Sequence, residues 1–301
     1  MPESEKQPVS SNEYDEEWIK ETWGWDTPEF FIKTQGRNLR PRITASLELA
    51  TMQPGMRILD IGCGRGEVIL YCGRAGINAV GIDYSEPALK LARQAKATHS
   101  KEEQDKMHFI QGDVDELMNT EPFDRIFMLD IVEHLHDQQL NEIFSKCFSL
   151  LKPDGFMIIH TLPNKWVYDI TYSKIIRLFM PWLPKNPRSE KEKVIHVNEM
   201  TIVHLYRLLT KAQFHNHVWL KDIIVEQARW HKKQPLKDNR GNVYKFLGMP
   251  IFGFLYQLIA KTPLRLLLVN EMFAIAWKDN RKKPIRTPLS LTERITIGLM
   301  G

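Results

Sequence analysis

Short apolar runs alternate with helix-forming stretches through the first half of the 301-residue chain. The apolar runs lie at 56–62, 78–84, 107–113, 123–130 and 155–161, and helical patterns lie at 67–76, 86–96 and 138–151. Unbroken apolar runs are typical of strands buried on both faces, and helices between strands favour parallel pairing. The pattern predicts an α/β fold with a doubly wound sheet, which binds ligands beyond the carboxyl ends of its strands.

The turn after the first predicted strand holds three glycines at alternate positions, Gly62, Gly64 and Gly66, within LDIGCGRGEV. In the dinucleotide fingerprint G-x-G-x-x-G the third glycine follows the first by five residues, a position held here by Glu67. A phosphate-binding loop requires Gly-Lys-Ser/Thr, which this segment does not contain. The turn has no lysine and is followed by an acidic residue, which favours a ligand without phosphates.

Aspartates stand at the ends of three successive predicted strands, at Asp60, Asp83 and Asp113. A single aspartate at a strand end is typical of a turn or a helix cap. Asp83 follows Gly62 by 21 residues, where a carboxylate can accept hydrogen bonds from ribose hydroxyls. Asp113 can accept a hydrogen bond from an exocyclic amine. Three such positions together favour a nucleoside site over three separate caps.

These stretches make the chain resemble the class I S-adenosylmethionine-dependent methyltransferases, and among them the ubiquinone- and menaquinone-type small-molecule enzymes. The resemblance covers roughly residues 42–164. The matching stretches are RILDIGCGRGEV, AVGIDYSEPALKLAR, FIQGDVDEL, FDRIFMLDIVEHLHD and LKPDGFMIIHTLPN. It implies a Rossmann-like seven-stranded sheet whose last strand is antiparallel, with a helical cap, and S-adenosylmethionine as the cofactor.

The resemblance also implies which residues bind this cofactor. They are Arg42, Asp60, Gly62, Cys63, Gly64, Asp83, Tyr84, Asp113, Val114 and Leu129. The backbone of the glycine turn would pack against the methionine part, with Asp60 near the ammonium group. Asp83 would hold the ribose, Tyr84 would flank the adenine and Asp113 would accept from the adenine amine. Arg42 has the alternative of being a solvated residue at a helix start.

The segment DIVEHLHD, residues 130–137, follows the fourth strand and carries the candidate chemistry. Asp130, Glu133 and His134 have helical i, i+3, i+4 spacing, which places them on one face. His134 can be a general base, or the three can bind a divalent ion that acidifies a phenol, or the Glu-His pair can be structural. Resemblance to the quinone-type enzymes suggests the metal, but those begin the set with glutamate. His160 and His196 are further catalytic candidates.

One position departs from the family pattern near the sixth strand. The family often has a glycine between Ala212 and Phe214, and this chain has Gln213. A glycine there normally adopts the left-handed conformation that ends a helix, which costs a non-glycine residue roughly 1 kcal/mol or more. We expect the effect to be confined to this turn.

Charge is divided unevenly along the chain. Residues 1–165 hold 18 Lys+Arg and 27 Asp+Glu, a balance of −9, and residues 166–301 hold 23 and 10, a balance of +13. The basic half can reflect solvated surface, or contact with an anionic surface or substrate. It also contains two apolar segments, at 166–190 and 228–270. Since a spanning helix needs about 20 apolar residues, the 15-residue segment 246–260, broken by glycine and proline, predicts at most peripheral membrane contact.

In the first apolar segment, helical spacing places one set of apolar residues on a single stripe: Tyr168, Tyr172, Ile175, Ile176, Phe179 and Met180. The stripe can pack on the core as in an ordinary amphipathic helix. It can instead lie at a membrane interface or cover a lipid-like tail.

The sequence predicts the following organisation: a disordered segment 1–14, a helical lid 15–45, a cofactor-binding core 46–165, a cap insertion 166–200, the rest of the core 201–278 with the insertion 228–270, and a basic tail 279–301. The first twenty residues lack the apolar core of a secretory signal. Three scattered cysteines form no even disulfide set and favour a reducing, cytoplasmic setting, with contact at the inner face of a membrane as an extension.

The sequence therefore predicts an S-adenosylmethionine-dependent methyltransferase that acts on a small or lipid-like molecule, on oxygen. Two alternatives are methylation of nucleic acid or protein, and a non-catalytic subunit that only binds the cofactor. Nucleic acid is disfavoured because the sequence has no recognisable nucleic-acid-binding module.

Overall fold

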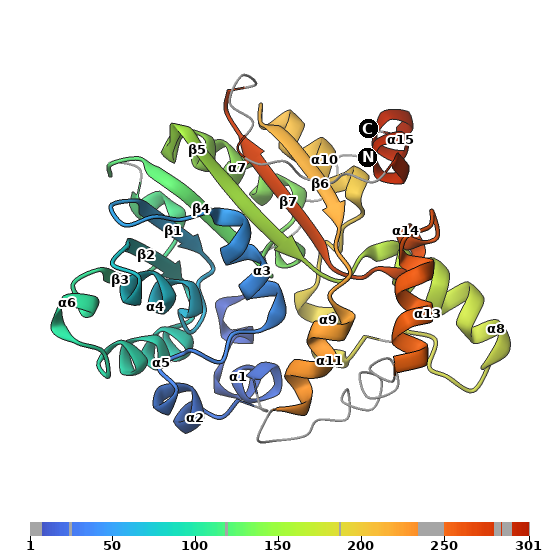
Figure 1. The fold of residues 1–301 in the computed structure, drawn as a ribbon, viewed down its shortest axis with the longest axis horizontal. Helices are drawn as coiled ribbons and strands as arrows, with labels where there is room; N and C mark the ends of the chain where they lie inside the picture. The colour runs from blue at the N-terminus through green and yellow to red at the C-terminus, as the bar shows by residue number, and fades with distance from the viewer. Residues whose placement is uncertain are drawn as a thin grey trace.

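The computed structural model describes residues 8–23, 26–117, 120–186, 188–233, 250–279, 284 and 291–300. The described residues form one seven-stranded sheet, in the order β3-β2-β1-β4-β5-β7-β6 (Figure 1). Its strands are β1 (Arg57–Ile61), β2 (Asn78–Asp83), β3 (Met107–Gln111), β4 (Phe123–Leu129), β5 (Leu151–Thr161), β6 (His215–Leu220) and β7 (Met272–Trp277). Strands β1 to β5 pair in parallel, and β7 is antiparallel to both β5 and β6. The predicted Rossmann-like sheet with an antiparallel last strand is confirmed.

Helices cover both faces of the sheet. On one face lie α3 (Pro41–Ala50), α4 (Glu67–Arg74) and α5 (Glu86–Lys96), and on the other lie α7 (Asp137–Leu150) and α10 (Ile202–Lys211). Alternate residues of one strand serve the two layers: Ile158 packs with the α3–α5 group, while Met157 and Ile159 pack with α7 and α10. Residues 156–159 of β5 are therefore apolar without interruption, as expected for a strand that is buried on both faces.

The chain before α3 forms a layer over the carboxyl edge of the sheet, here called the N-terminal layer: η1 (Ser11–Glu13), α1 (Glu16–Trp23) and α2 (Pro28–Lys33) (Figure 1). Arg65 in the glycine turn holds this layer in place. Its guanidinium is buried, lies 2.6 Å from Asp26 Oδ2 and 2.7 Å from Glu67 Oε1, and stacks on the Phe31 ring. The lid predicted from residue 15 onward therefore packs directly on the glycine turn.

The disorder predicted for residues 1–14 does not extend to the end of that range. Residues 1–7 lie outside the described residues, but Ser11–Glu13 form a helical turn and Tyr14 is buried. The Tyr14 carbonyl accepts a hydrogen bond from Ser85 Oγ at 2.8 Å. A long-range contact that the sequence does not reveal therefore orders this segment.

The first insertion holds a π-helix, η4 (Val167–Ile176), then α8 (Arg177–Phe179) and α9 (Glu190–Ile195), and the second holds α11 (Ile224–Lys232), α13 (Pro250–Ala260) and α14 (Arg265–Leu268). The two insertions reach the end of the molecule away from β3 with α8, α13 and α14, while their helices α9 and α11 lie nearer its centre (Figure 1). Residues 234–249 of the predicted second insertion lie outside the described residues, as do 280–283 and 285–290 of the predicted tail. The remaining short elements are α6 (Lys101–Gln104), η2 (Val114–Leu117), η3 (Val132–His134) and α15 (Leu291–Met300).

The predicted stripe at 168–180 does not pack on the core. Ile175, Ile176, Phe179 and Met180 are exposed, with Phe179 at 73%. In η4 the hydrogen bonds run from i to i+5, so the 3.6-residue spacing used for the prediction does not apply there. The described helices include none with the length and hydrophobicity that would carry it across a bilayer.

Candidate cofactor and acceptor site

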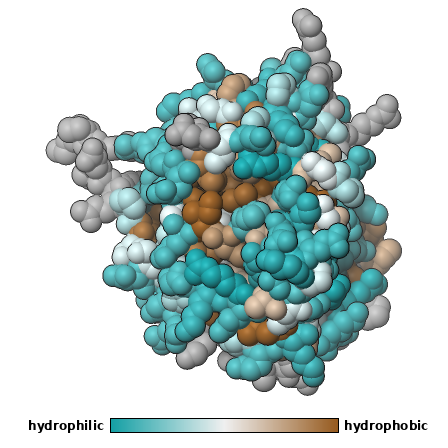
Figure 2. Space-filling model, turned by 90° about the vertical axis from the view of Figure 1, so that its left-hand side faces the viewer, coloured by the Kyte–Doolittle hydropathy of each residue, from teal (hydrophilic) through white to brown (hydrophobic). Residues whose placement is uncertain are grey.

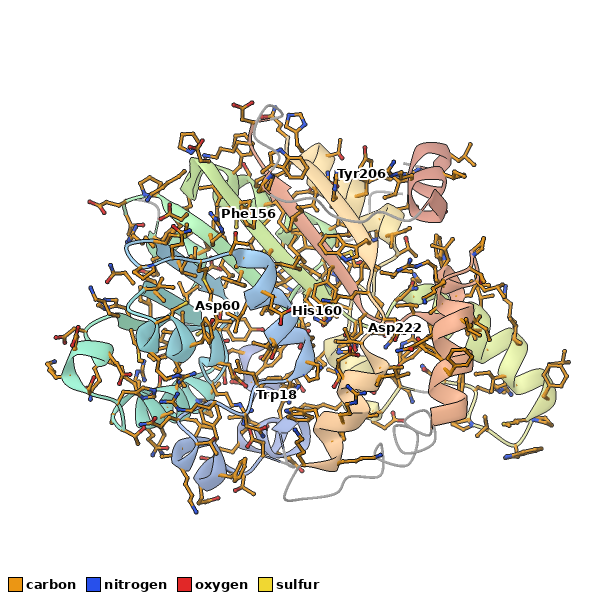
Figure 3. All side chains as sticks on the ribbon, in the orientation of Figure 1. Trp18, Asp60, Phe156, His160, Tyr206 and Asp222 are labelled. Atoms are coloured by element: carbon orange, nitrogen blue, oxygen red, sulfur yellow. The ribbon has the colours of Figure 1, made fainter. Side chains whose placement is uncertain are left out.

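A cavity lies where the parallel strands end. The residues after β1, β2, β4 and β5 line it, together with Glu271 immediately before β7. The N-terminal layer, α9 and α11 close its other sides. Figure 3 shows Asp60 of β1, His160 of β5 and Trp18 of α1 in this central part of the molecule.

Most of the predicted cofactor-binding residues come together on this cavity. They are Arg42, Asp60, Gly62, Cys63, Gly64, Asp83, Tyr84 and Leu129. Asp113 and Val114 are not among the described residues that line it. Asp113 is exposed, and its Oδ1 accepts from the Asp115 backbone at 3.2 Å, as expected for a turn cap. Its contact with adenine stays a prediction.

The glycine turn is shaped for a ligand to approach its backbone. Gly62 has φ 70°, and a Cβ there would lie 2.7 Å from Ile131 Cδ1, so only glycine fits without a shift. The Gly64 N–H donates to Asp83 Oδ2 and the Ser85 N–H donates to Asp83 Oδ1, both at 2.8 Å. Asp83 thus joins two strand ends, and its remaining lone pairs are available for ribose hydroxyls.

Asp60 lies beneath the turn and is 3% exposed. Burial, with Glu67 and Asp83 nearby, raises its pKa well above the usual range. An ammonium group beside it would favour the ionised carboxylate. The cradle at Gly62 and the acids at Asp60 and Asp83 therefore fit S-adenosylmethionine, which carries an amino acid part, a sulfonium and a ribose.

A row of alternating charges lies under the cavity. Arg42 Nε donates to Asp130 Oδ2 at 2.6 Å, and His160 lies between Asp130 Oδ1 at 2.5 Å and Glu271 Oε2 at 2.7 Å. Burial alone would lower the pKa of His160, but Asp130 and Glu271 outweigh it and raise the pKa to about 9. His160 is fully buried and is not among the described residues that line the cavity, so its catalytic role stays a prediction.

Glu133, His134 and His196 form a second cluster, which lines the cavity. Glu133 is 1% exposed, its Oε2 accepts from Thr161 Oγ1 at 2.8 Å, and burial with nearby Asp130 raises its pKa to about 7. His134 Nδ1 lies 3.1 Å from the Ile195 carbonyl, which assigns Nδ1 as the donor and Nε2 as the acceptor. Burial, with His196 nearby, lowers the pKa of His134 to about 3. This histidine is therefore neutral near pH 7.

The structure changes the candidate metal set. The predicted set was Asp130, Glu133 and His134, but both Asp130 oxygens are engaged by Arg42 and His160. Among the described residues, one ligand atom from each of Glu133, His134 and His196 lies within 4.8 Å of the others. If a divalent cation binds here, His196 replaces Asp130, whose carboxylate already has cationic neighbours.

The sequence analysis missed several cavity residues. Tyr14 and Trp18 come from the segment before the family pattern begins, and Trp230 and His231 come from α11. Glu271 could have been predicted from the expected antiparallel last strand. Because β7 is antiparallel, the residue before its start lies at the edge where the parallel strands end. The other residues reach the cavity through tertiary packing that no local pattern reveals.

This sheet order, the glycine turn and the acidic strand ends define a class I S-adenosylmethionine-dependent methyltransferase. A family model for a methyltransferase domain matches residues 34–217. The chain belongs to this methyltransferase family, and S-adenosylmethionine is the cofactor that the residues of its cavity fit.

Curated relatives include ubiquinone biosynthesis O-methyltransferases. The enzyme of Caulobacter sp. (strain K31) is 31% identical over 141 residues, which cover 46% of this chain and 53% of the relative. That of Bordetella avium (strain 197N) is 30% identical over 162 residues, 52% of this chain and 65% of the relative. The chain thus matches between half and two thirds of the length of these relatives.

Solved structures share the fold at low sequence identity. A Haemonchus contortus phosphoethanolamine N-methyltransferase has a TM-score of 0.53 and 20% identity, covering 88% of this chain and 60% of its own. Geranyl diphosphate C-methyltransferase from Streptomyces coelicolor A3(2) has a TM-score of 0.52 and 12% identity, covering 79% and 78%. These two enzymes are named for methyl acceptors of different kinds, so the likeness shows the fold alone.

Proposed function

We propose that this methyltransferase transfers a methyl group to a hydroxyl oxygen of a small, lipid-like molecule. The observation that carries the proposal is Glu133, a buried carboxylate on the cavity beside a neutral histidine. The curated relatives, named as ubiquinone biosynthesis O-methyltransferases, support oxygen as the acceptor. A hydroxyl is a weak nucleophile until a base removes its proton.

In this proposal the cofactor is held at the turn after β1. Gly62 and Gly64 would contact the methionine part, Asp60 would pair with its ammonium group, and Asp83 would accept from the ribose. When bound, S-adenosylmethionine supplies a methyl group activated by its sulfonium. The protein supplies alignment of the acceptor oxygen and exclusion of water.

Glu133 is the proposed general base. Thr161 donates to Oε2 and holds the carboxyl group in place, which leaves Oε1 to take the acceptor's hydroxyl proton. A base is most effective when its pKa lies near the working pH, and burial brings Glu133 there. The orientation of His134 by the Ile195 carbonyl makes its Nε2 a hydrogen-bond acceptor that can orient the same hydroxyl.

The test is methyl transfer from S-adenosylmethionine to a catechol that carries a short prenyl chain. Glu133→Gln should lower kcat roughly 10²–10⁴-fold, with unchanged affinity for S-adenosylhomocysteine. The wild-type rate should rise with pH through about 7, because the base must be ionised. Glu192→Gln, which changes another carboxylate on the cavity, should stay within a few-fold of wild type.

Methylation at carbon or nitrogen, or full activity of Glu133→Gln, would contradict the proposal. The same assay with a chelator, followed by added Mg²⁺, examines the Glu133–His134–His196 cluster as a cation site. Loss of activity with the chelator and its return with Mg²⁺ would replace Glu133 as the base by a metal-bound acceptor.

The lipid-like part of the proposal rests on an exposed surface, here called the insertion surface. Its residues are Ile175, Ile176, Leu178, Phe179, Met180, Trp182, Phe254, Leu258, Ile259 and Leu264. They come from η4–α8 and from α13–α14, which lie together at one end of the molecule (Figure 1). Patches of this kind on a surface mark contact with a partner or a membrane.

The charged residues in the two chain segments that carry the insertion surface are all basic. Residues 170–186 and 250–270 contain no aspartate or glutamate, while Lys174, Lys185 and Lys261 are exposed among them. Exposed apolar side chains with lysine at their borders fit an anionic bilayer surface. We therefore propose peripheral contact with an anionic membrane.

The insertion surface is connected to the cavity. Asn164, near the start of the first insertion, donates to the Leu266 and Val269 carbonyls at the end of the second, at 2.9 and 3.0 Å. Leu162 lies two residues before Asn164 and Glu271 lies two residues after Val269, and both line the cavity. Docking through the insertions would therefore place the cavity near the membrane, where a lipid-like acceptor is found.

A further inference from the structure

Tyr14 is a buried residue on the cavity with no assigned role. It is 6% exposed and lines the cavity together with Asp83, Tyr84 and His134. Its hydroxyl is buried and forms no hydrogen bond of ordinary length and angle among the described residues, with the Tyr84 hydroxyl as its polar neighbour. A buried hydroxyl is normally hydrogen-bonded, so this one points to a partner that binds in the cavity.

The Tyr14 ring is held by aromatic contacts on three sides. Its centroid lies 5.0 Å from that of Trp18, 5.3 Å from that of Tyr84 and 5.7 Å from that of His134, all edge to face. These contacts fix the ring between the end of β2 and the cluster that contains His134. The side chain is therefore preorganised, and a ligand does not have to order it.

The backbone around Tyr14 is tied to both sides of the cavity. Ser85 Oγ, just beyond Asp83 and Tyr84, donates to the Tyr14 carbonyl at 2.8 Å. On the other side Glu13 pairs with Lys191 of α9 at 3.3 Å. Residues 13 and 14 thus bridge the strand end that would hold the nucleoside and the first insertion, and they cover the cavity between them.

We propose that Tyr14 is a cofactor-binding residue whose hydroxyl donates a hydrogen bond to an oxygen of bound S-adenosylmethionine. Two contacts favour the cofactor over the methyl acceptor as the partner of Tyr14. The Tyr14 carbonyl is bonded to Ser85, which lies two residues after Asp83, the proposed ribose-binding carboxylate. The Tyr14 ring also lies closer to the ring of Tyr84 than to that of His134. Burial raises the pKa of Tyr14, and the neighbouring Tyr84 raises it further. The Tyr14 hydroxyl therefore keeps its proton and can donate a hydrogen bond. The inference does not depend on which acceptor is methylated.

The test is Tyr14→Phe, which removes the oxygen and keeps the ring. Calorimetry with S-adenosylhomocysteine should show a Kd about tenfold higher than wild type, as expected for one lost hydrogen bond. Thermal unfolding of the ligand-free variant should show an equal or higher Tm, because the substitution removes a buried polar atom without a partner. A purely structural tyrosine would lower Tm and leave Kd unchanged.

Tyr206→Phe is the matched control, since Figure 3 places Tyr206 on α10, far from Asp60 and Trp18. Its Kd for S-adenosylhomocysteine should equal that of wild type. A Tyr14→Phe variant with Kd within twofold of wild type overturns the proposal. So does an unchanged Kd with a raised KM for the acceptor, since the hydroxyl would then face the acceptor.

Discussion

Asp130 shows how one residue sets the charge pattern under the cavity. It directly follows β4 with φ 57°, in the left-handed region that aspartate tolerates better than most residues. This conformation brings its carboxylate between Arg42 and His160. Burial would raise the pKa of Asp130, but these two cations outweigh it and lower the pKa well below the usual range. Arg42 and His160 are therefore partners of Asp130, while their cofactor and catalytic roles stay predictions.

The pairing of His160 predicts a pH dependence of stability. Its pKa is about 9 in the folded protein and about 6.5 when unfolded, so the folded state binds the proton more tightly. This contribution is fully present below pH 6.5 and is lost as pH rises through 9. Between pH 6.5 and pH 9, the difference in free energy of unfolding between wild type and His160→Gln should therefore shrink by up to about 3 kcal/mol. Urea unfolding at pH 6, 7, 8 and 9 measures this.

His215→Gln is the control for His160, because His215 is exposed at the start of β6. Its difference from wild type in free energy of unfolding should stay constant across the same pH series. A constant difference for His160→Gln would mean that the imidazole is neutral between Asp130 and Glu271, and that the charge row is wrong.

Elements with a strong local signal were predictable from the sequence. The predicted helix 86–96 matches α5, which Ser85 caps by accepting from the Ala88 N–H, with Pro87 in its first turn. The central strands matched because burial on both faces requires unbroken apolar runs. Strand β5 begins at Leu151 rather than 155, since Lys152, Pro153 and Asp154 lie at its less buried start and carry no strand pattern.

The site was predictable only where it lies in the glycine turn and at the strand ends. The predicted cofactor residues after β1 and β2 line the cavity because parallel strands end at one edge. Tyr14 could not be found in this way, since contacts with Ser85 and Tyr84, some 70 residues away, bring it there. The π-helical turns of η4 were also hidden, because they change which residues share a face.

The end of α10 tests how much one backbone conformation costs. Gln213 follows the helix with φ 66°, as expected for the position where the family often has glycine. Its side chain is exposed, so a substitution removes little packing. Gln213→Gly should raise the free energy of unfolding by about 0.5–1 kcal/mol, because glycine adopts this conformation without a steric penalty. Chemical denaturation of the two proteins measures the difference.

Lys211→Gly is the matched control within the same helix. Lys211 is the last residue of α10 and is exposed, with an ordinary helical position. Glycine there should lower the free energy of unfolding by up to about 1 kcal/mol. If Gln213→Gly destabilises the protein as Lys211→Gly does, the left-handed turn carries no strain that glycine relieves.

The molecule as a whole is uneven in polarity. The side of the molecule away from the insertions is mainly hydrophilic, with hydrophobic residues gathered near its centre (Figure 2). At the other end, Leu178, Phe179 and Trp182 of the insertion surface are each 73–76% exposed. Most of the large apolar side chains that are exposed among the described residues therefore lie in the two insertions.

This asymmetry predicts binding to anionic vesicles through the insertion surface. In flotation with vesicles containing about one third phosphatidylglycerol, the triple variant Leu178→Ser, Phe179→Ser, Trp182→Ser should bind at least tenfold more weakly than wild type, because it removes apolar area that would enter the interface. The triple variant Lys174→Glu, Lys185→Glu, Lys261→Glu should lose binding mainly at low salt. Each lysine contributes about 1 kcal/mol near the surface, and at physiological salt this attraction is screened beyond a Debye length of about 8 Å.

The control changes Ile295 and Leu299, which are exposed on α15 outside the insertions, to serine and should bind like wild type. If wild type does not float with anionic vesicles, or if the α15 variant loses as much binding as the first triple variant, the insertions do not form a membrane surface and the lipid-like acceptor loses its support.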